Sequence, residues 1–138
     1  MSKVKVDTSN EELLKKPVYV PIEPGIYEFE IDNDLEVTQS NAGKPMIGVK
    51  LVCIDQNEAV IGKSVTDYIS MTPEARKKYD RFATLCKACG VKEDAAGEID
   101  LEQFRGLRLR ANIKQETYKK KDGSTGISNK VDEYLFNS

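Results

Sequence analysis

Apolar and acidic side chains alternate along the first third of the chain. Between Tyr27 and Val37 the odd positions are mainly apolar and every even position is acidic, which is the period-two pattern of a strand that buries one face. Two further apolar segments, separated from it and from each other by turn residues, predict strands at 46–54 and 59–69. The pattern therefore predicts three antiparallel strands in succession.

The spacing of apolar residues changes after residue 71. Thr72 suits the N-cap of a helix and Pro73 its first position, and Gly90 is a natural stop at the far end. Between them, apolar residues recur three or four positions apart, which predicts one amphipathic helix. Its apolar face comprises Ala75, Tyr79, Phe82, Cys86 and Cys89.

Alternation resumes near the end of the chain and predicts strands at 107–114 and 127–136. Asp122 and Gly123 form the turn of a hairpin between them. Five strands with one helix between the third and the fourth is the order of the OB-fold, a five-stranded Greek-key barrel. We therefore predict an all-β fold with one helix, an OB-fold over residues 24–138, preceded by an N-terminal extension of residues 1–23.

Charge is distributed unevenly along the chain. Residues 103–130 contain eight basic and two acidic residues, a net charge of +6, whereas the whole chain carries −2. Residues 1–60 contain six basic and eleven acidic residues. A basic region within an acidic protein is typical of a face that binds a polyanion.

Composition limits the other classes of protein. A chain of 138 residues with 39% hydrophobic residues fits one globular domain. No apolar run approaches the roughly 20 residues that span a bilayer, and residues 1–6 lack the apolar block of a signal peptide. We therefore expect no membrane association and a cytoplasmic location.

Cys86 and Cys89 have the spacing of a metal or redox pair. Zinc would need two more ligands, but the chain has no histidine and only Cys53 besides. A reactive pair would gain thiolate stability at a helix N-terminus, whereas this pair lies in the last turns of the predicted helix. We expect both cysteines to be packing residues, in a reducing compartment.

Catalytic motifs are missing from the sequence. It has no histidine, no phosphate-binding glycine-rich loop and no Gly-x-Ser-x-Gly elbow. Acidic residues such as Asp32 and Asp34 alternate along one strand instead of converging as a nuclease metal site requires. We expect a protein that is not an enzyme and needs no cofactor.

Six short segments resemble a known family. They are 24–31 (PGIYEFEI), 40–46 (SNAGKPM), 62–68 (GKSVTDY), 82–90 (FATLCKACG), 106–109 (GLRL) and 129–131 (NKV). Together they resemble a family of small phage and prophage proteins that bind single-stranded DNA, over about residues 20–136. The resemblance implies an OB-fold, single-stranded DNA as ligand, and a role in DNA replication or recombination in the cytoplasm of a bacterial host. Phage replication or recombination proteins, and further copies of the chain, are the other candidate partners.

The predicted binding residues lie on strands two to five and on the loops that an OB-fold uses for oligonucleotides. Basic side chains would contact backbone phosphates, and two tyrosines would stack on bases. The predicted set is Lys44, Lys63, Tyr68, Arg108, Arg110, Lys114, Tyr118, Lys119, Lys120, Lys121 and Lys130.

Several alternatives remain open at this point. Arg108 and Arg110 could pair with Glu28 or Glu30 across the sheet, which would weaken the basic face. The three hairpin lysines could serve only as a solvated tip, and Tyr118 could close the hairpin. A non-catalytic module for protein interaction is the alternative function.

Overall fold

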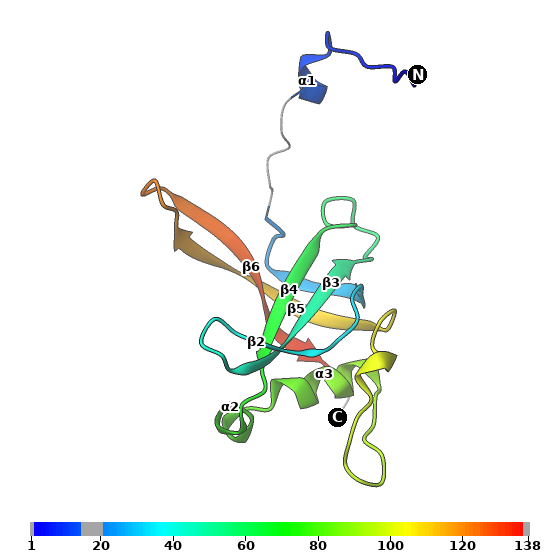
Figure 1. Ribbon diagram of the computed structural model, residues 1–138, viewed down its shortest axis with the longest axis vertical. Coiled ribbons are helices and arrows are strands. Elements are labelled where there is room, and N and C mark those ends of the chain that lie inside the picture. Colours follow the sequence, from blue (N-terminus) through cyan, green and yellow to red (C-terminus); the bar gives the residue numbers. More distant parts are fainter. Residues whose placement is uncertain (1, 15–20, 137–138) are drawn as a thin grey trace.

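The computed structural model describes residues 2–14 and 21–136 of the chain (Figure 1). Six strands form one antiparallel sheet. One short helix precedes the strands, and the other helical segments lie between β4 and β5. The strands are β1 (Gly25–Ile31), β2 (Val37–Gln39), β3 (Pro45–Cys53), β4 (Ser64–Ser70), β5 (Arg108–Lys119) and β6 (Thr125–Leu135); the helices are α1 (Glu11–Leu14), α2 (Pro73–Lys78), α3 (Arg81–Cys89) and the 3-10 turn η1 (Leu101–Gln103). No helix in these ranges is long and apolar enough to cross a membrane.

The β-rich character predicted from the sequence is confirmed, but the number of strands differs. The sheet order is β2-β3-β1-β5-β6, and β4 pairs with the other side of β3. On its β2 and β1 side, β3 pairs first with β2, through Ile47 and Val37, and later with β1, through Cys53 and Phe29. The single first strand expected from the alternating pattern is therefore two strands, β1 and β2.

Asn33 explains how the chain can bend between β1 and β2. Its Nδ2 donates to the carbonyl of Gly48 at 2.9 Å, and its Oδ1 accepts from the amide of Lys50 at 2.8 Å. The Asn33 side chain thus hydrogen-bonds to backbone groups of β3 at a position between the part that pairs with β2 and the part that pairs with β1. Because backbone groups of β3 keep their partners, the bend leaves the sheet intact.

Asp67 links β4 to β6, two strands that share no backbone ladder in the described ranges. Its Oδ2 accepts a hydrogen bond from the hydroxyl of Tyr134 on β6 and another from Arg81 Nε of α3, the latter at 2.8 Å. Arg81 also donates to the carbonyl of Val131, and its guanidinium lies 5.5 Å from the centre of the Tyr134 ring. The three side chains hold β4, β6 and α3 together.

The ionisation of this cluster follows from its burial. Burial, followed by the charge and hydrogen bond of Asp67, raises the pKa of the Tyr134 hydroxyl well above its ordinary value. Burial lowers the pKa of Arg81, but the hydrogen bond and charge of Asp67 raise it by more, so the net shift is upward. Tyr134 therefore remains a neutral donor and Arg81 a cation.

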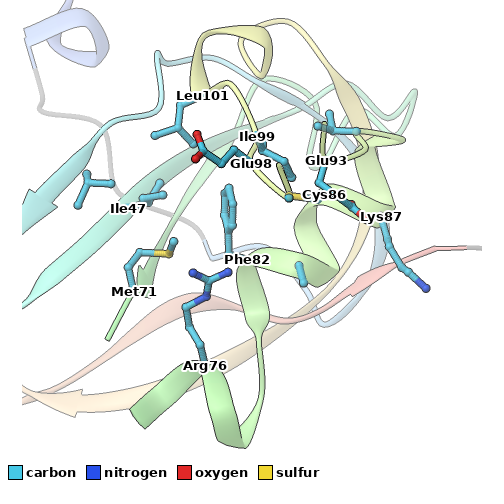
Figure 2. Close-up of a pocket in the computed structure, with 14 residues that line it drawn as sticks. Ile47, Met71, Arg76, Phe82, Cys86, Lys87, Glu93, Glu98, Ile99 and Leu101 are labelled. Carbon is cyan, nitrogen blue, oxygen red and sulfur yellow. The ribbon is translucent and has the colours of Figure 1, made fainter. Parts of the chain in front are cut away.

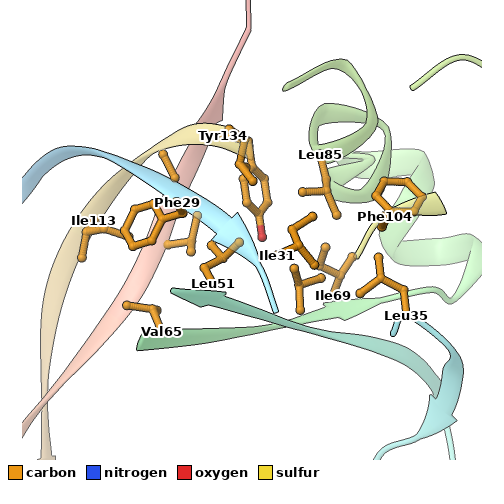
Figure 3. Close-up of a cluster of buried hydrophobic side chains, with 14 of the residues drawn as sticks. Phe29, Ile31, Leu35, Leu51, Val65, Ile69, Leu85, Phe104, Ile113 and Tyr134 are labelled. Atoms are coloured by element: carbon orange, nitrogen blue, oxygen red, sulfur yellow. The ribbon is translucent and has the colours of Figure 1, made fainter. Parts of the chain in front are cut away.

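The core lies between the inner face of the sheet and α3 (Figure 3). Phe29, Leu51 and Ile69 are fully buried from the strand side, and Leu85 is fully buried from α3. Phe104, which follows η1, packs against Phe82 of α3 with ring centres 5.9 Å apart. The helix thus covers one end of the sheet.

The single helix expected after Thr72 is two helices. Thr72 is the N-cap of α2 as predicted, but the chain becomes extended at Tyr79, and Asp80 caps a new helix by accepting from the amide of Ala83 at 3.1 Å. The break rotates the apolar face, so Tyr79, expected in the core, is 55% exposed, and Leu85 is buried instead. Gly90 ends α3 with φ of 74°, as the sequence indicated.

The chain before β1 joins the core at Ile22. Asn129 on β6 pairs with the backbone of Ile22, accepting from its amide and donating to its carbonyl, each at 2.8 Å, and Gln115 of β5 donates to the same carbonyl. Ile22 is fully buried. Ile22, which lies in the range that we assigned to the extension, is therefore part of the core.

Replacing Tyr134 by Phe tests the link between β4 and β6. The change removes one hydrogen bond to the Asp67 carboxylate, so we expect the free energy of unfolding to fall by about 1.5–3 kcal/mol. Tyr27→Phe is the matched control, because the Tyr27 hydroxyl donates only to a backbone carbonyl, that of Glu23, in an exposed position. Urea unfolding of both variants measures the difference. If both variants lose the same free energy of unfolding, the hydrogen bond to Asp67 stabilises the fold no more than an exposed hydrogen bond does.

Candidate nucleic-acid interface

Tyr68 and Tyr118 each lie across a glycine of the neighbouring strand. Tyr68 on β4 pairs with Gly48 on β3, and Tyr118 on β5 pairs with Gly126 on β6. A Cβ atom added to Gly48 would lie 3.4 Å from the ring of Tyr68, and one added to Gly126 would lie 2.5 Å from Cζ of Tyr118. Each ring therefore occupies the space that a cross-strand side chain would take.

Both rings remain open to solvent, with Tyr68 63% and Tyr118 49% exposed. One side of each ring is supported by the glycine, so the aromatic surface is held in place before any ligand arrives. A preordered exposed aromatic ring is the form of site on which a nucleic-acid base stacks. These two positions are the strongest candidates for base contact.

The turn after β2 borders the surface around Tyr68. Ser40, Asn41, Met46 and Tyr68 line a shallow cavity of about 360 Å³. The turn is closed by a hydrogen bond from the amide of Ser40 to the carbonyl of Lys44 at 2.8 Å. Lys44 is exposed, so its ammonium group extends from the same turn that borders the tyrosine.

Lys119, Lys120 and Lys121 are all exposed at the tip of the β5–β6 hairpin. The tip is organised by Asp122, which accepts from the amide of Ser124 at 2.9 Å and from its hydroxyl at 2.6 Å. These hydrogen bonds lower the pKa of Asp122, so it stays negative at neutral pH. The Asp-Gly turn predicted from the sequence is confirmed, with Gly123 at φ of 88°.

The outward face of β5 is less basic than its sequence suggests. Arg108 Nε lies 3.7 Å from the carboxylate of Glu30, which is its cross-strand neighbour on β1. Lys114 Nζ lies 3.3 Å from Glu116 and 3.9 Å from Asp132. The cross-strand pairing that competed with a binding role is therefore present for Arg108.

The remaining predicted basic residues, Arg110, Lys130 and Lys63, differ in their neighbours and in their exposure. Arg110 lies opposite Glu28 in the register, with no ion pair to any described residue. Lys130 lies opposite Lys114, and Lys63 is half-buried just before β4. The ion pairs of Arg108 and Lys114 are exposed, so each contributes at most about 1 kcal/mol, and a phosphate could replace the carboxylate in either of them.

The structure thus divides the predicted site into two parts. The turn between β2 and β3, which carries Lys44, and the tip of the β5–β6 hairpin, which Tyr118 precedes, both extend to the left in Figure 1. Arg108 and Arg110 lie instead at the other end of β5, beside the end of α3. There they line a cavity of about 590 Å³ together with Lys87, a cation that the sequence pattern did not single out.

Sequence reasoning also missed Gly48 and Gly126. Neither glycine stands in a turn, and nothing near either in the sequence indicates a tyrosine opposite it. A glycine inside a strand signals close approach of another group, which is the only hint that the sequence offers. The partner becomes known only when the strand register is known.

The three cysteines are unpaired thiols. Cys86 is part of the buried core, as expected, and Cys89 packs against it half-buried. Burial raises the pKa of Cys86 to about 11 and the pKa of Cys89 to about 12. The main cause of these raised thiol pKa values is thus burial, and not the position at the end of the helix that we invoked from the sequence. No group of three metal-binding side chains occurs among the residues described.

These thiols should react slowly in the folded protein, because the thiolate is the reactive form. We expect alkylation of Cys86 and Cys89 at pH 8 to be far slower before unfolding than after it, as mass spectrometry of timed samples would show. In the folded protein each thiol stays protonated to a higher pH than in the unfolded chain. The free energy of unfolding should therefore fall as pH rises from about 9 towards 11. The variant with both cysteines changed to Ala should show a smaller fall, because Cys53 and Tyr134, whose pKa values burial also raises, still contribute; similar curves for parent and variant would contradict the assignment.

No curated protein matches the chain. A family described as "Protein of unknown function (DUF669)" matches residues 4–125, which include β1 to β5 and the hairpin tip. The match extends over most of the chain, including the turn with Lys44, Tyr68, Tyr118 and the three hairpin lysines. The chain therefore belongs to the DUF669 family.

Proposed function

We propose that this protein binds single-stranded DNA without sequence preference. The observation that carries the proposal is the pair of exposed tyrosines, Tyr68 and Tyr118, each supported by a cross-strand glycine. Stacking on an aromatic ring contributes about 1–3 kcal/mol per base and tolerates any base, because every base has a flat π face. Two such rings beside exposed lysines provide both parts of a sequence-independent site.

We infer in addition that the sheet is an OB-type barrel. Counting β1 and β2 as one bent strand, the order of strands in the sheet is third, second, first, fourth and fifth, with the helices between the third and the fourth. The Asp67 cluster joins the third strand to the fifth, which is the junction that closes such a barrel. In this fold the ligand lies on strands two and three, between the loops after strands one and four.

That location coincides with the candidate site. Strands two and three of the barrel are β3 and β4, which carry Gly48 and Tyr68, and the two loops carry Lys44 and the hairpin lysines. Phosphates would contact these lysines, which form no ion pair with any described residue. Arg108 and Lys114 would contribute less, because each already has an acidic neighbour.

The biological setting that we propose is replication or recombination of phage-type DNA in the cytoplasm of a bacterial host. The protein would cover single strands that other enzymes then use. Its part is binding alone, with no catalytic step and no cofactor. This setting rests on the family resemblance of the sequence.

Changing the tyrosines tests stacking. We expect Tyr68→Leu and Tyr118→Leu each to weaken binding of oligo(dT) by about 1–3 kcal/mol, because leucine covers the glycine but cannot stack. Tyr79→Leu is the matched control, since Tyr79 is as exposed but lies at the end of α2. Fluorescence anisotropy measures affinity, and the chain has six tyrosines and no tryptophan, so quenching of tyrosine emission by DNA reports stacking directly. If the Tyr79 variant loses as much as the others, the rings are not the site.

Changing the hairpin lysines tests phosphate contact. Each phosphate contact to a single strand contributes about 0.7 to the slope of log affinity against log salt. We therefore expect replacement of Lys119, Lys120 and Lys121 by Ala to flatten that slope by about 2 at most. Replacement of Lys77, Lys78 and Lys92 by Ala is the control with the same change in net charge. An unchanged slope in the hairpin variant would identify the tip as a solvated turn.

The parent protein decides between the two functions considered. An affinity for single-stranded DNA that is highest at low salt and falls as the salt concentration rises supports the proposal. If the parent binds no oligonucleotide even in low salt, the nucleic-acid proposal fails, and a module for protein interaction takes its place.

A further inference from the structure

Another cavity, larger than the one beside Tyr68, lies at the end of the sheet that α3 covers. It has a volume of about 700 Å³ and is bounded by β2, α2, α3 and the segment 91–101 (Figure 2). Its lining is mainly apolar and includes Ile47, Met71, Phe82, Ile99 and Leu101; Arg76, Lys87, Glu93 and Glu98 also line it, with the charged groups of Arg76 and Glu98 close to Phe82. Nothing in the proposed DNA site uses it.

Strand β2 forms one side of this cavity and has a free edge. It pairs with β3 on one side only, and its three residues are all exposed. Val37 of β2 lines the cavity and lies directly across from Ile47, so both side chains are on the same face. An unpaired strand edge can accept a further strand, and alternate side chains of that strand would then enter the cavity beside Val37.

The N-terminal segment of this chain has the pattern of such a strand. Residues 3–7 alternate between Lys or Asp and Val, so Val4 and Val6 would share one face of a strand. In the structure they are 84% and 78% exposed, and the segment pairs with no described strand. Two exposed valines at period two match a free edge beside an apolar cavity.

Charge agrees with this pairing. Glu36 stands just before Val37, so its side chain is on the opposite face, and it forms no ion pair with any described residue. The lysines at positions 3 and 5 would lie on that same outer face once the valines point inward. Opposite charges on neighbouring strands stabilise the pairing of those strands.

Geometry favours a cavity on another molecule. The chain is held at Ile22 by Asn129 and Gln115; residues 2–14 lie at the top of Figure 1, whereas α2 and α3 lie at the bottom. The segment thus points away from the cavity of its own copy. The DUF669 match starts at Val4, so it includes both valines and every residue of the segment except Lys3.

We propose that residues 3–7 of one copy add as a strand to the free edge of β2 in a second copy, with Val4 and Val6 in the cavity beside Val37. The contact joins two different surfaces, so it links copies head to tail and can extend into a chain. Five residues form a small interface, so the dissociation constant should be on the order of 10 µM to 1 mM. On a shared DNA strand, neighbouring copies would be close enough for this weak contact to make binding cooperative.

The test uses two variants with complementary defects. Val4→Ser with Val6→Ser removes the inserted side chains, and Val37→Glu places a charge at the cavity; Ile61→Ser, an exposed apolar residue in a turn, is the control. Sedimentation velocity over a range of concentrations, without DNA, measures self-association. Far-UV circular dichroism checks that each variant is folded.

We expect the parent and the Ile61 variant to form dimers and longer chains as concentration rises, and each defective variant to stay monomeric. Mixing the two defective variants should restore a complex of two copies and no more, because one supplies an intact segment and the other an intact cavity. A monomeric parent at all concentrations, association unaffected by the variants, or a mixture that stays monomeric would each overturn the proposal. Because no DNA is present, the result does not depend on the proposed function.

Discussion

The fold depends on the carboxylate of Asp67, which connects the two ends of the sheet. β4 and β6 exchange no ladder hydrogen bonds in the described ranges, so side chains must join them, and Asp67 does this by accepting from Tyr134 and Arg81 together. A buried carboxylate is tolerated only with such partners, because losing solvent costs a charged group several kcal/mol. Since Arg81 is also the first residue of α3, the same carboxylate sets where the helix lies against the core.

The candidate binding surface follows from the curved arrangement of the sheet. β3 pairs on one side with β4 and on the other with β2 and β1, and the pairing with β4 brings Gly48 under Tyr68. The long β5–β6 hairpin repeats this arrangement with Gly126 and Tyr118 and carries three lysines beyond the ring. The neighbouring strand therefore gives each aromatic ring its exposure and its fixed position. Because the rings are already ordered, their side chains should lose little conformational entropy when a ligand binds.

The molecule has two separate surfaces with different physical character. The surface around Tyr68 and the hairpin is polar, cationic and aromatic, whereas the cavity between β2 and α3 is apolar with a mixed rim. Strand addition at β2 would bury the exposed edge and the two valines, whereas Tyr68 is on β4, which pairs with the other side of β3. The proposed DNA site and the proposed contact between copies use different residues, so each proposal can be tested by mutations that leave the other site unchanged.

The sequence alone determined the features that depend on neighbouring residues. These are the alternating strands, the Asp122-Gly123 turn, the cap at Thr72, the stop at Gly90 and the unequal distribution of charge, each of which follows from local conformational preference or composition. The tertiary structure decided what depends on residues far apart in the chain. It split the first strand at Asn33, began a new helix at Asp80, placed Glu30 beside Arg108, and set a glycine under each exposed tyrosine. Periodicity specifies which face of a strand is buried, but the partner strand and its register arise only when the whole core packs.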